Sequence, residues 1–368
     1  PARSSGRRGG PKAGCGHPGR GWLFRRSRAG FFGKISKLNV IVTTRTRGRL
    51  PSPPRLAAAV LAAAALAFSW TTPAAPPGSK SVYSRRLAAV PEAVAVAAPA
   101  SEDAGRAERI LASALATIAE ADSFAAVIRQ KVRVGDRVLV GTGRYMQSGR
   151  GEDQRYRFES TLTCDSQTFE LVEVCDGLFA WTFRHYGDDA PQLERRDVRR
   201  VRERLAELKA ADPLTTAPYL GGLQRSFGML RQWFQFVSAE PGEVEGQPVW
   251  VVDGRWSADW LHVILPDLAA AARRPEGIAP GELPDGVPWG VRFFIGRTDL
   301  VPRRVEWLAV PGPRPVAAAT PEVVAVLELQ DVRIGGPVDA GAFVYKPAAD
   351  GLIDLTEDHV KGLGLMRP

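Results

Sequence analysis

Histidine and cysteine are scarce in this sequence, and the shortage limits the chemistry that the chain can perform. The four histidines show no metal-ligand spacing such as HExxH, and neither a G-x-S-x-G motif nor a phosphate-binding P-loop occurs. Residues 14–19 formally fit G-x-G-x-x-G, but no strand precedes them and Pro18 stands where a helix would begin. A hydrolase could pair His185 with Asp188 or Asp189, yet a solvated loop is the simpler interpretation because no nucleophile is placed beside them. We therefore expect no catalytic residue, no metal and no cofactor.

Acidic residues are absent from positions 1–55, which hold fourteen Arg or Lys residues. The whole chain has 49 basic and 40 acidic residues, so the part from Leu56 onward holds 35 basic against 40 acidic residues, a net charge of −5. A mildly acidic folded part argues against nucleic acid as the partner. Positions 1–38 are rich in Gly, Arg, Ser and Pro, so we expect 1–55 to be a disordered basic extension ending in a cationic n-region.

The apolar run at 56–70 has 15 residues, fewer than the roughly 20 that a transmembrane helix needs. We interpret 56–75 as the h-region of a signal peptide, since a buried Ala-rich helix would not need the basic flank and the following prolines. Pro76 and Pro77 stand where cleavage would occur, so an uncleaved anchor in the inner membrane stays open. No cysteine follows the run, which excludes the usual lipoprotein modification. We expect 76–100 to be an Ala/Pro linker and the mature chain to be periplasmic.

Two cysteines, Cys164 and Cys175, fall in the predicted folded part. If Asp165 and Ser166 form a two-residue turn, position 164 faces 167 and position 175 faces 156. The two thiols then lie beyond the reach of a disulfide. We expect both cysteines to be free and buried.

The pattern from 101 onward predicts a helix followed by an antiparallel meander. A helix is expected over 101–122, with acidic residues in its first turn. Alternation of apolar and charged residues then predicts strands at 124–134 and 154–164. Further strands are expected at 137–147, 167–175 and 179–183, with Asp176-Gly177 as a hairpin turn.

Helices interrupt the strands before a second group begins. We expect helices from Asp197 to about 208, over 217–233 and near 256–264, and strands at 234–256, 290–296, 303–310 and 323–334. Two groups of strands separated by helices favour one domain, 101–368, of the α+β class. The predicted architecture is mainly antiparallel: a curved, half-closed β-barrel with helices covering its concave face.

Four segments together resemble the LolA-type carriers of outer-membrane lipoproteins, a LolA-like/LolB-like superfamily. Ser123 to Val132 is similar to that family's opening strand, and Gly141 to Tyr145 to its second strand. Val172 to Gly177 with Ala180-Trp181-Thr182-Phe183 resembles its S-D-G-x-x-x-W-x-Y hairpin, and Gly335 to Asp339 with Phe343, Tyr345 and Pro347 its closing strand and tail. The match runs with gaps over about 102–360. It implies a half-closed barrel with a helical lid over an apolar cavity, and no catalytic residues.

Two departures from the family pattern bear on function. Gln147-Ser148-Gly149-Arg150 stands where the family has Lys-Arg-Pro, so the role of the family's lid arginine is not carried over to a residue of this sequence. Helical insertions near 197–232 and 257–288 lengthen the chain. The resemblance therefore implies a divergent, monomeric and non-enzymatic periplasmic carrier.

Alternate side chains of a strand face opposite sides of a sheet. The expected binding surface is therefore the face to which the apolar set of alternating side chains points. The candidate cavity residues are Phe124, Ile128, Val132, Tyr145, Tyr156, Phe158, Trp181 and Phe183. The expected partners are lipoproteins or lipids, bound through acyl chains, together with an inner-membrane release complex and an outer-membrane acceptor. The alternative is an envelope sensor or structural protein that uses the same fold to detect lipoproteins, and a hydrolase is the third.

Overall fold

The computed structural model describes residues 102–208, 220–274, 277–284, 287–310, 320–347 and 351–363. The predicted basic extension, signal segment and linker lie outside the described residues. No helix within the described ranges is long and apolar enough to cross a membrane.

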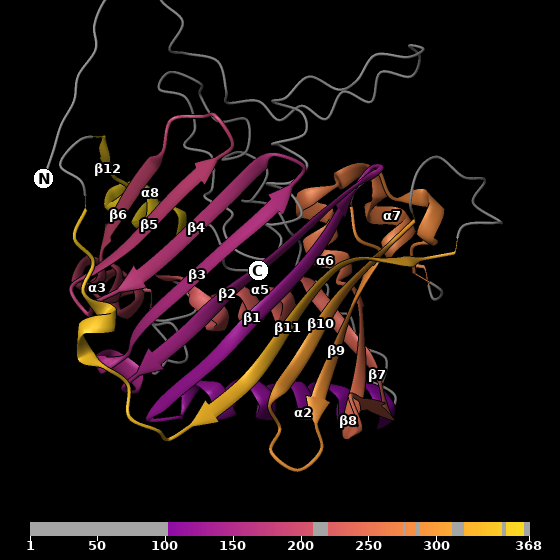
Figure 1. Cartoon of the computed structure of the whole chain (residues 1–368). Coiled ribbons are helices and arrows are strands. Elements are labelled where there is room, and N and C mark those ends of the chain that lie inside the picture. Colours follow the sequence, from indigo (N-terminus) through magenta and orange to yellow (C-terminus); the bar gives the residue numbers. More distant parts are fainter. Residues whose placement is uncertain are drawn as a thin grey trace, which may run out of the picture. The chain divides into compact units, whose positions relative to one another are not determined.

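One twelve-stranded sheet dominates the described part of the chain, in the order β12-β6-β5-β4-β3-β2-β1-β11-β10-β9-β8-β7 (Figure 1). The first group is β1 (Ser123–Val134), β2 (Arg137–Ser148), β3 (Arg155–Cys164), β4 (Gln167–Cys175), β5 (Phe179–Tyr186) and β6 (Gln192–Asp197). The second group is β7 (Phe234–Val244), β8 (Gln247–Trp256), β9 (Gly290–Gly296), β10 (Pro302–Ala309), β11 (Glu322–Ile334) and β12 (Leu352–Asp354).

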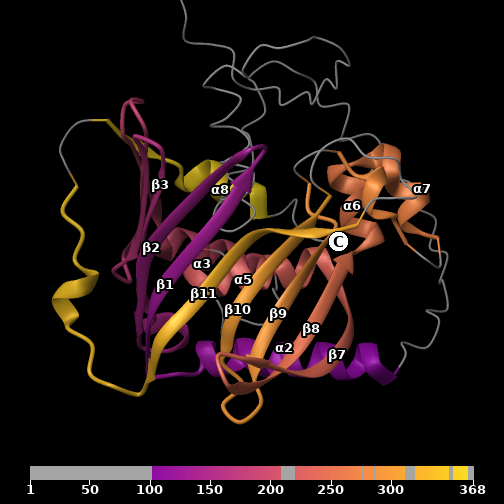
Figure 2. The same cartoon turned by 45° about the vertical axis from the view of Figure 1, so that its right-hand side comes forward.

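The two groups of strands meet at two places: β1 pairs with β11 in antiparallel fashion, with Ile128 opposite Leu329, and the short β12 pairs with β6. Every neighbouring pair is antiparallel except β12 with β6, which is parallel. The ends of the sheet, β12 and β7, do not pair with each other, so the sheet is open and curved (Figure 2). The predicted fold class, a mainly antiparallel half-barrel with helices, is confirmed.

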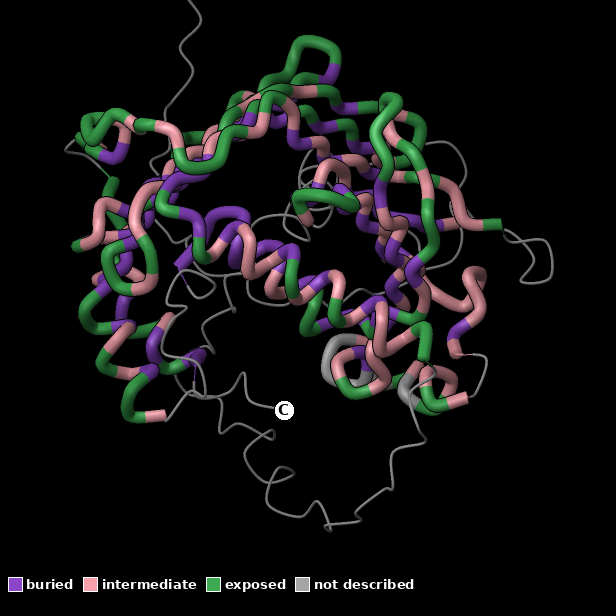
Figure 3. The backbone as a smooth tube through the Cα atoms, turned by 90° about the horizontal axis from the view of Figure 1, so that it is seen from below, coloured by how far each residue is buried: buried purple, intermediate pink, exposed green. Residues whose placement is uncertain are grey.

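Two helices, α2 (Glu102–Ala119) and α5 (Gly222–Trp233), lie on the concave side of the sheet (Figure 2). On α2, the side chains of Ala107, Leu111, Ala114 and Ile118 recur at helical spacing and are fully buried. Seen from below, α2 runs across the space between the two halves of the sheet (Figure 3).

The remaining helices lie beside the strands that they follow. At the end of β6, the Asp197 carboxylate caps α3 (Val198–Glu207) by accepting a hydrogen bond of 3.0 Å from the Arg200 backbone N–H. Helix α8 (Thr356–Leu363) packs against α3 and β6. Helices α6 (Ala258–Ile264) and α7 (Ala269–Ala272) follow β8, and short 3₁₀ turns span Gly151–Asp153, Pro266–Leu268, Pro280–Glu282 and Ala340–Phe343.

The β3–β4 hairpin confirms the prediction about the cysteines. Cys164 stands opposite Gln167 and Cys175 stands opposite Tyr156, as the two-residue turn requires. Asp165 in that turn has a φ of 54°. Both thiols are free and buried.

Candidate ligand-binding face

Six of the predicted cavity residues share the concave face of the sheet and are buried there. Cross-strand pairing places Ala126, Tyr145 and Phe158 in one row, because residues directly opposite each other project to the same side. Phe124, Ile128 and Val132 alternate along β1 on that same side, and Tyr156 lies beside Phe158 on β3. These six side chains are no more than 6% exposed, so each belongs to the core between sheet and helices.

The assignment of Trp181 and Phe183 to the concave face is wrong. Trp181 stands opposite Val174, which in turn faces Arg157, and this row projects to the outer side of the sheet. Phe183 occupies the same parity and is only half-buried. On β5 both parities carry large side chains, so alternation alone could not choose the face.

Aromatic packing explains why Trp181 is buried on the outer side. The segment that follows β11 crosses there, and the Tyr345 ring lies 5.7 Å from the Trp181 ring, centroid to centroid. Arg157 donates a 3.1 Å hydrogen bond to the Ala342 carbonyl in the same segment. The Arg195 guanidinium lies 5.9 Å from the Trp181 ring centroid. The C-terminal segment thus gives Trp181 an apolar environment that does not depend on the concavity.

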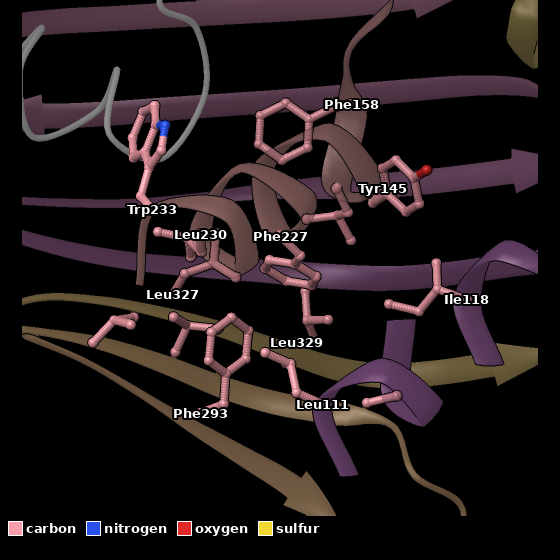
Figure 4. Close-up of a cluster of buried hydrophobic side chains, with 14 of the residues drawn as sticks. Leu111, Ile118, Tyr145, Phe158, Phe227, Leu230, Trp233, Phe293, Leu327 and Leu329 are labelled. Carbon is pink, nitrogen blue, oxygen red and sulfur yellow. The ribbon is translucent and has the colours of Figure 1, made fainter. Parts of the chain in front are cut away.

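Helix α5 fills the middle of the concavity with its own side chains. Phe227 and Leu230 are 1% exposed and lie between the two halves of the sheet (Figure 4). The Phe227 ring meets Phe293 of β9 edge-on at 5.6 Å. On the other side lie Leu327 and Leu329 of β11, and Leu111 and Ile118 of α2 close one end. In this arrangement helix side chains occupy the space that an acyl chain would need.

The start of α5 is fitted closely to two tyrosines. Gly222 has a φ of +71°, and a methyl group added there would lie 3.0 Å from the Tyr156 ring and 3.2 Å from the Tyr145 ring. Only glycine adopts this backbone conformation without cost and also leaves room for the rings. The Gly222 N–H donates a 2.9 Å hydrogen bond to a carboxylate oxygen of Glu173. The entry into α5 is therefore set by contacts with β2, β3 and β4.

The concave face changes from apolar to ionic at β4, β5 and β6. Glu194 accepts from Arg184 at 2.8 Å and from Arg196 at 3.2 Å, and Arg196 also donates to the Thr182 hydroxyl at 3.2 Å. These four side chains are at most 8% exposed. Register places them on the concave side, because Thr182 and Glu194 continue the row of Phe158 and Glu173.

Arg225 of α5 adds a third buried guanidinium to this region. Burial and the nearby Arg196 lower the pKa of Arg225 to about 10, so the side chain is still cationic at neutral pH. The region therefore holds three guanidinium groups and the carboxylates of Glu173 and Glu194. Arg184 Nη2 and Arg196 Nε, both buried, have no hydrogen-bond partner in the described part of the chain.

Polar side chains also connect α5 to α2 through β2. Gln147 donates to the Ile118 carbonyl at 2.7 Å, while its side-chain oxygen accepts from Gln224 at 3.1 Å and from the Tyr145 hydroxyl at 3.0 Å. Burial raises the pKa of the Tyr145 and Tyr156 hydroxyls above the ordinary value, so both stay protonated. This hydrogen-bond network fixes the positions of α2 and α5 relative to β2.

Sequence reasoning missed the ionic half of the face, although a signal was present. Thr182, Arg184, Glu194 and Arg196 occupy one parity of β5 and β6, with opposite charges placed to pair. Arginine and glutamate ordinarily face water, so the sequence alone predicts that these alternate residues of β5 and β6 are exposed to solvent unless their ion-pair partners are known. In the described ranges no three His, Cys, Asp or Glu side chains are grouped to hold a metal ion.

Comparison with known proteins returns matches to solved structures only. No protein-family model and no curated protein sequence matches the chain. The complex of Pseudomonas aeruginosa MucA/MucB matches at 11% identity with a TM-score of 0.28, covering 64% of this chain and 60% of that one. LprF from Mycobacterium bovis matches at 13% identity and a TM-score of 0.31, covering 65% of this chain and 97% of that one.

A LolA superfamily protein, NE2245 from Nitrosomonas europaea, matches at 13% identity and a TM-score of 0.23, covering 65% of this chain and 97% of that one. This is the superfamily that the sequence segments resemble. The chain spans about 60% of the length of the matched MucB chain. At these identities and scores, the likeness concerns the fold alone.

Proposed function

We propose that this protein is a non-catalytic carrier that holds the acyl chains of lipids or lipoproteins between the concave face of its sheet and helix α5. The observation that carries the proposal is the position of Phe227 and Leu230. They fill the space between the two sheet halves from a separate helix, not from the sheet itself (Figure 4). Displacing one helix would expose apolar surface on β1, β9 and β11 without breaking a strand pairing.

The chemistry of this surface suits an acyl chain. Ile128, Phe293 and Leu327 are buried and offer no hydrogen bonds, so affinity has to come from apolar burial, at about 25 cal/mol per Å². The same burial now stabilises α5 in its docked position. Ligand and helix therefore compete for one surface. The free energy of ligand binding is the difference between the apolar burial that the ligand gains and the apolar burial that α5 loses when it moves away.

The ionic half of the concave face favours a ligand with an anionic group at one end of the apolar chain. Arg184, Arg196 and Arg225 outnumber the carboxylates beside them, and two of their buried N–H groups are unsatisfied in the described structure. A phosphate or carboxylate there would accept those hydrogen bonds. An amphiphile with its acyl chain toward β11 and its anionic headgroup toward β5 would contact the apolar half of the concave face with its chain and the ionic half with its headgroup.

A carrier of this kind belongs in the periplasm, which is also the compartment that the sequence of the N-terminal segment favours. Its partners in this proposal are a membrane source and a membrane acceptor of lipid or lipoprotein. Catalysis plays no part in it, because binding and release need only the movement of α5.

Native mass spectrometry of the purified protein, followed by lipid extraction, tests the proposal. We expect recovered lipid and exchange with a fluorescent fatty acid. Phe227→Ala removes the side chain that competes with the ligand and should speed exchange, whereas Gln232→Ala on the exposed side of the same helix should not. The proposal fails if the folded wild-type protein, checked by circular dichroism, yields no lipid and exchanges no fatty acid.

A further inference from the structure

A groove of about 830 Å³ opens on the outer face of the sheet, across β3, β2, β1, β11 and β10. It lies on the side opposite the concave face, because Arg129, Lys131 and Arg133 occupy the parity of β1 that alternates with Ile128 and Val132. Nothing in the carrier proposal uses this surface.

The cations of the groove form a line along β1 with valines on both sides. Lys131 stands between Val140 of β2 and Val326 of β11, and Arg133 stands opposite Val138. Val138 and Val140 are 42% and 51% exposed, so their methyl groups are open to solvent. A ligand lying over β1 would meet positive charge in the centre and apolar surface at the flanks.

Ion pairing within the described part of the chain divides these cations into two pairs. Arg133 pairs with Glu322 at 3.0 Å, and Arg304 pairs with Glu328 at 3.2 Å. Arg129 and Lys131 form no ion pair among the residues that the structure describes. Four cations and one carboxylate, Glu328, line the groove, while Glu322 and Glu306 pair with Arg133 and Arg304 from beside it. The charge that no described ion pair compensates is therefore that of Arg129 and Lys131, in a folded part whose net charge is negative.

The position of β1 decides which kind of partner fits. β1 is a central strand with β2 on one side and β11 on the other, so its backbone groups are already paired and an added peptide strand cannot be bound through them. Recognition has to come from the charged and apolar side chains alone. In an anionic bilayer, phosphate groups lie above methylene groups. The phosphates complement the cationic side chains, and the methylenes complement the apolar ones.

We propose that this groove docks the protein onto anionic phospholipid membranes, with Arg129 and Lys131 contacting lipid phosphates and Val138 and Val140 contacting the first methylenes. Docking through the outer face leaves the concave face free. The inference therefore does not depend on the carrier function, and either can fail without the other.

Vesicle co-sedimentation of the full chain tests the inference, using phosphatidylcholine vesicles with and without phosphatidylglycerol. The test variant is Arg129→Glu with Lys131→Glu. The control is Arg109→Glu with Arg199→Glu, two exposed positions on α2 and α3 that change the net charge equally. Each basic side chain near an anionic surface contributes about 1 kcal/mol, or about fivefold in binding, so removing two lowers binding by about 25-fold, and the two added carboxylates lower it further.

We expect the wild type and the control to bind vesicles that contain phosphatidylglycerol, and the test variant to lose at least an order of magnitude in affinity. Val138→Ser with Val140→Ser should weaken binding by a smaller factor that does not change with salt. Circular dichroism shows whether each variant is folded. The inference is overturned if the test variant binds like the control, because the contact then lies elsewhere, or if the wild type does not distinguish the two kinds of vesicle.

Discussion

Replacing Gly222 by alanine probes the contact that holds α5 in the concavity. The alanine would have to adopt a φ of +71°, and the left-handed region costs an L-residue about 1–2 kcal/mol. Its methyl group would also lie 3.0 Å from the Tyr156 ring and 3.2 Å from the Tyr145 ring, both fully enclosed. Overpacking of this kind adds about 1–3 kcal/mol, so the expected loss of unfolding free energy is about 2–5 kcal/mol.

Gly246 supplies a matched control for this substitution. It has a φ of +77°, but a methyl group added there meets no atom within 4 Å. Gly246→Ala should therefore cost only the backbone contribution, about 1–2 kcal/mol. Urea unfolding followed by circular dichroism gives both values, and fatty-acid exchange should be faster in Gly222→Ala alone. Equal losses of stability in the two variants would show that the tyrosines do not pack against the start of α5.

Three further predictions concern the ionic region, alkaline pH and the outer face. Glu194→Ala leaves the buried Arg184 and Arg196 without their shared carboxylate and should lower the unfolding free energy by about 3–5 kcal/mol. By contrast, Glu203→Ala removes only exposed ion pairs, with Arg199 and Arg200, and should leave the unfolding free energy nearly unchanged, so similar losses in chemical denaturation would contradict the buried pairing. Burial raises the pKa of Cys175 from 9.0 to about 11, so its stabilising contribution is complete below pH 9 and disappears as the pH rises to about 11. The unfolding free energy should fall by about 2–3 kcal/mol over that interval, and Cys175→Ala should lack this part of the decline, which pH-dependent urea titrations would detect. Trp181→Ala should lower the unfolding free energy by about 3–5 kcal/mol yet leave fatty-acid exchange unchanged. A changed rate of exchange would show that Trp181 does contact the ligand.

Local patterns in the sequence were sufficient for much of the fold. Period-two alternation on β1 identifies Ile128 as inward and Arg129 as outward, and the Asp165-Ser166 turn fixes which residues face the two cysteines. These features depend on neighbours within a few positions of the chain. A pattern of that range is visible before any tertiary contact is known.

The features that the sequence did not predict depend on contacts between distant segments. Trp181 faces outward because Tyr345 covers it, and those residues are far apart in the chain. Arg184 and Arg196 face inward because Glu194 pairs with both of them, although isolated arginines ordinarily face water. Parallel pairing of β12 with β6 is likewise set by the C-terminal segment and has no local signal.

Photo-crosslinking with a fatty acid that carries a diazirine in its chain tests the central claim most directly. The protein is irradiated with the bound probe and its peptides are then mapped by mass spectrometry. The account predicts adducts on the inner side chains of α5, β9 and β11, with Phe227, Phe293 and Leu327 among them. Adducts confined to the outer face, or none in a folded protein saturated with the probe, would contradict it.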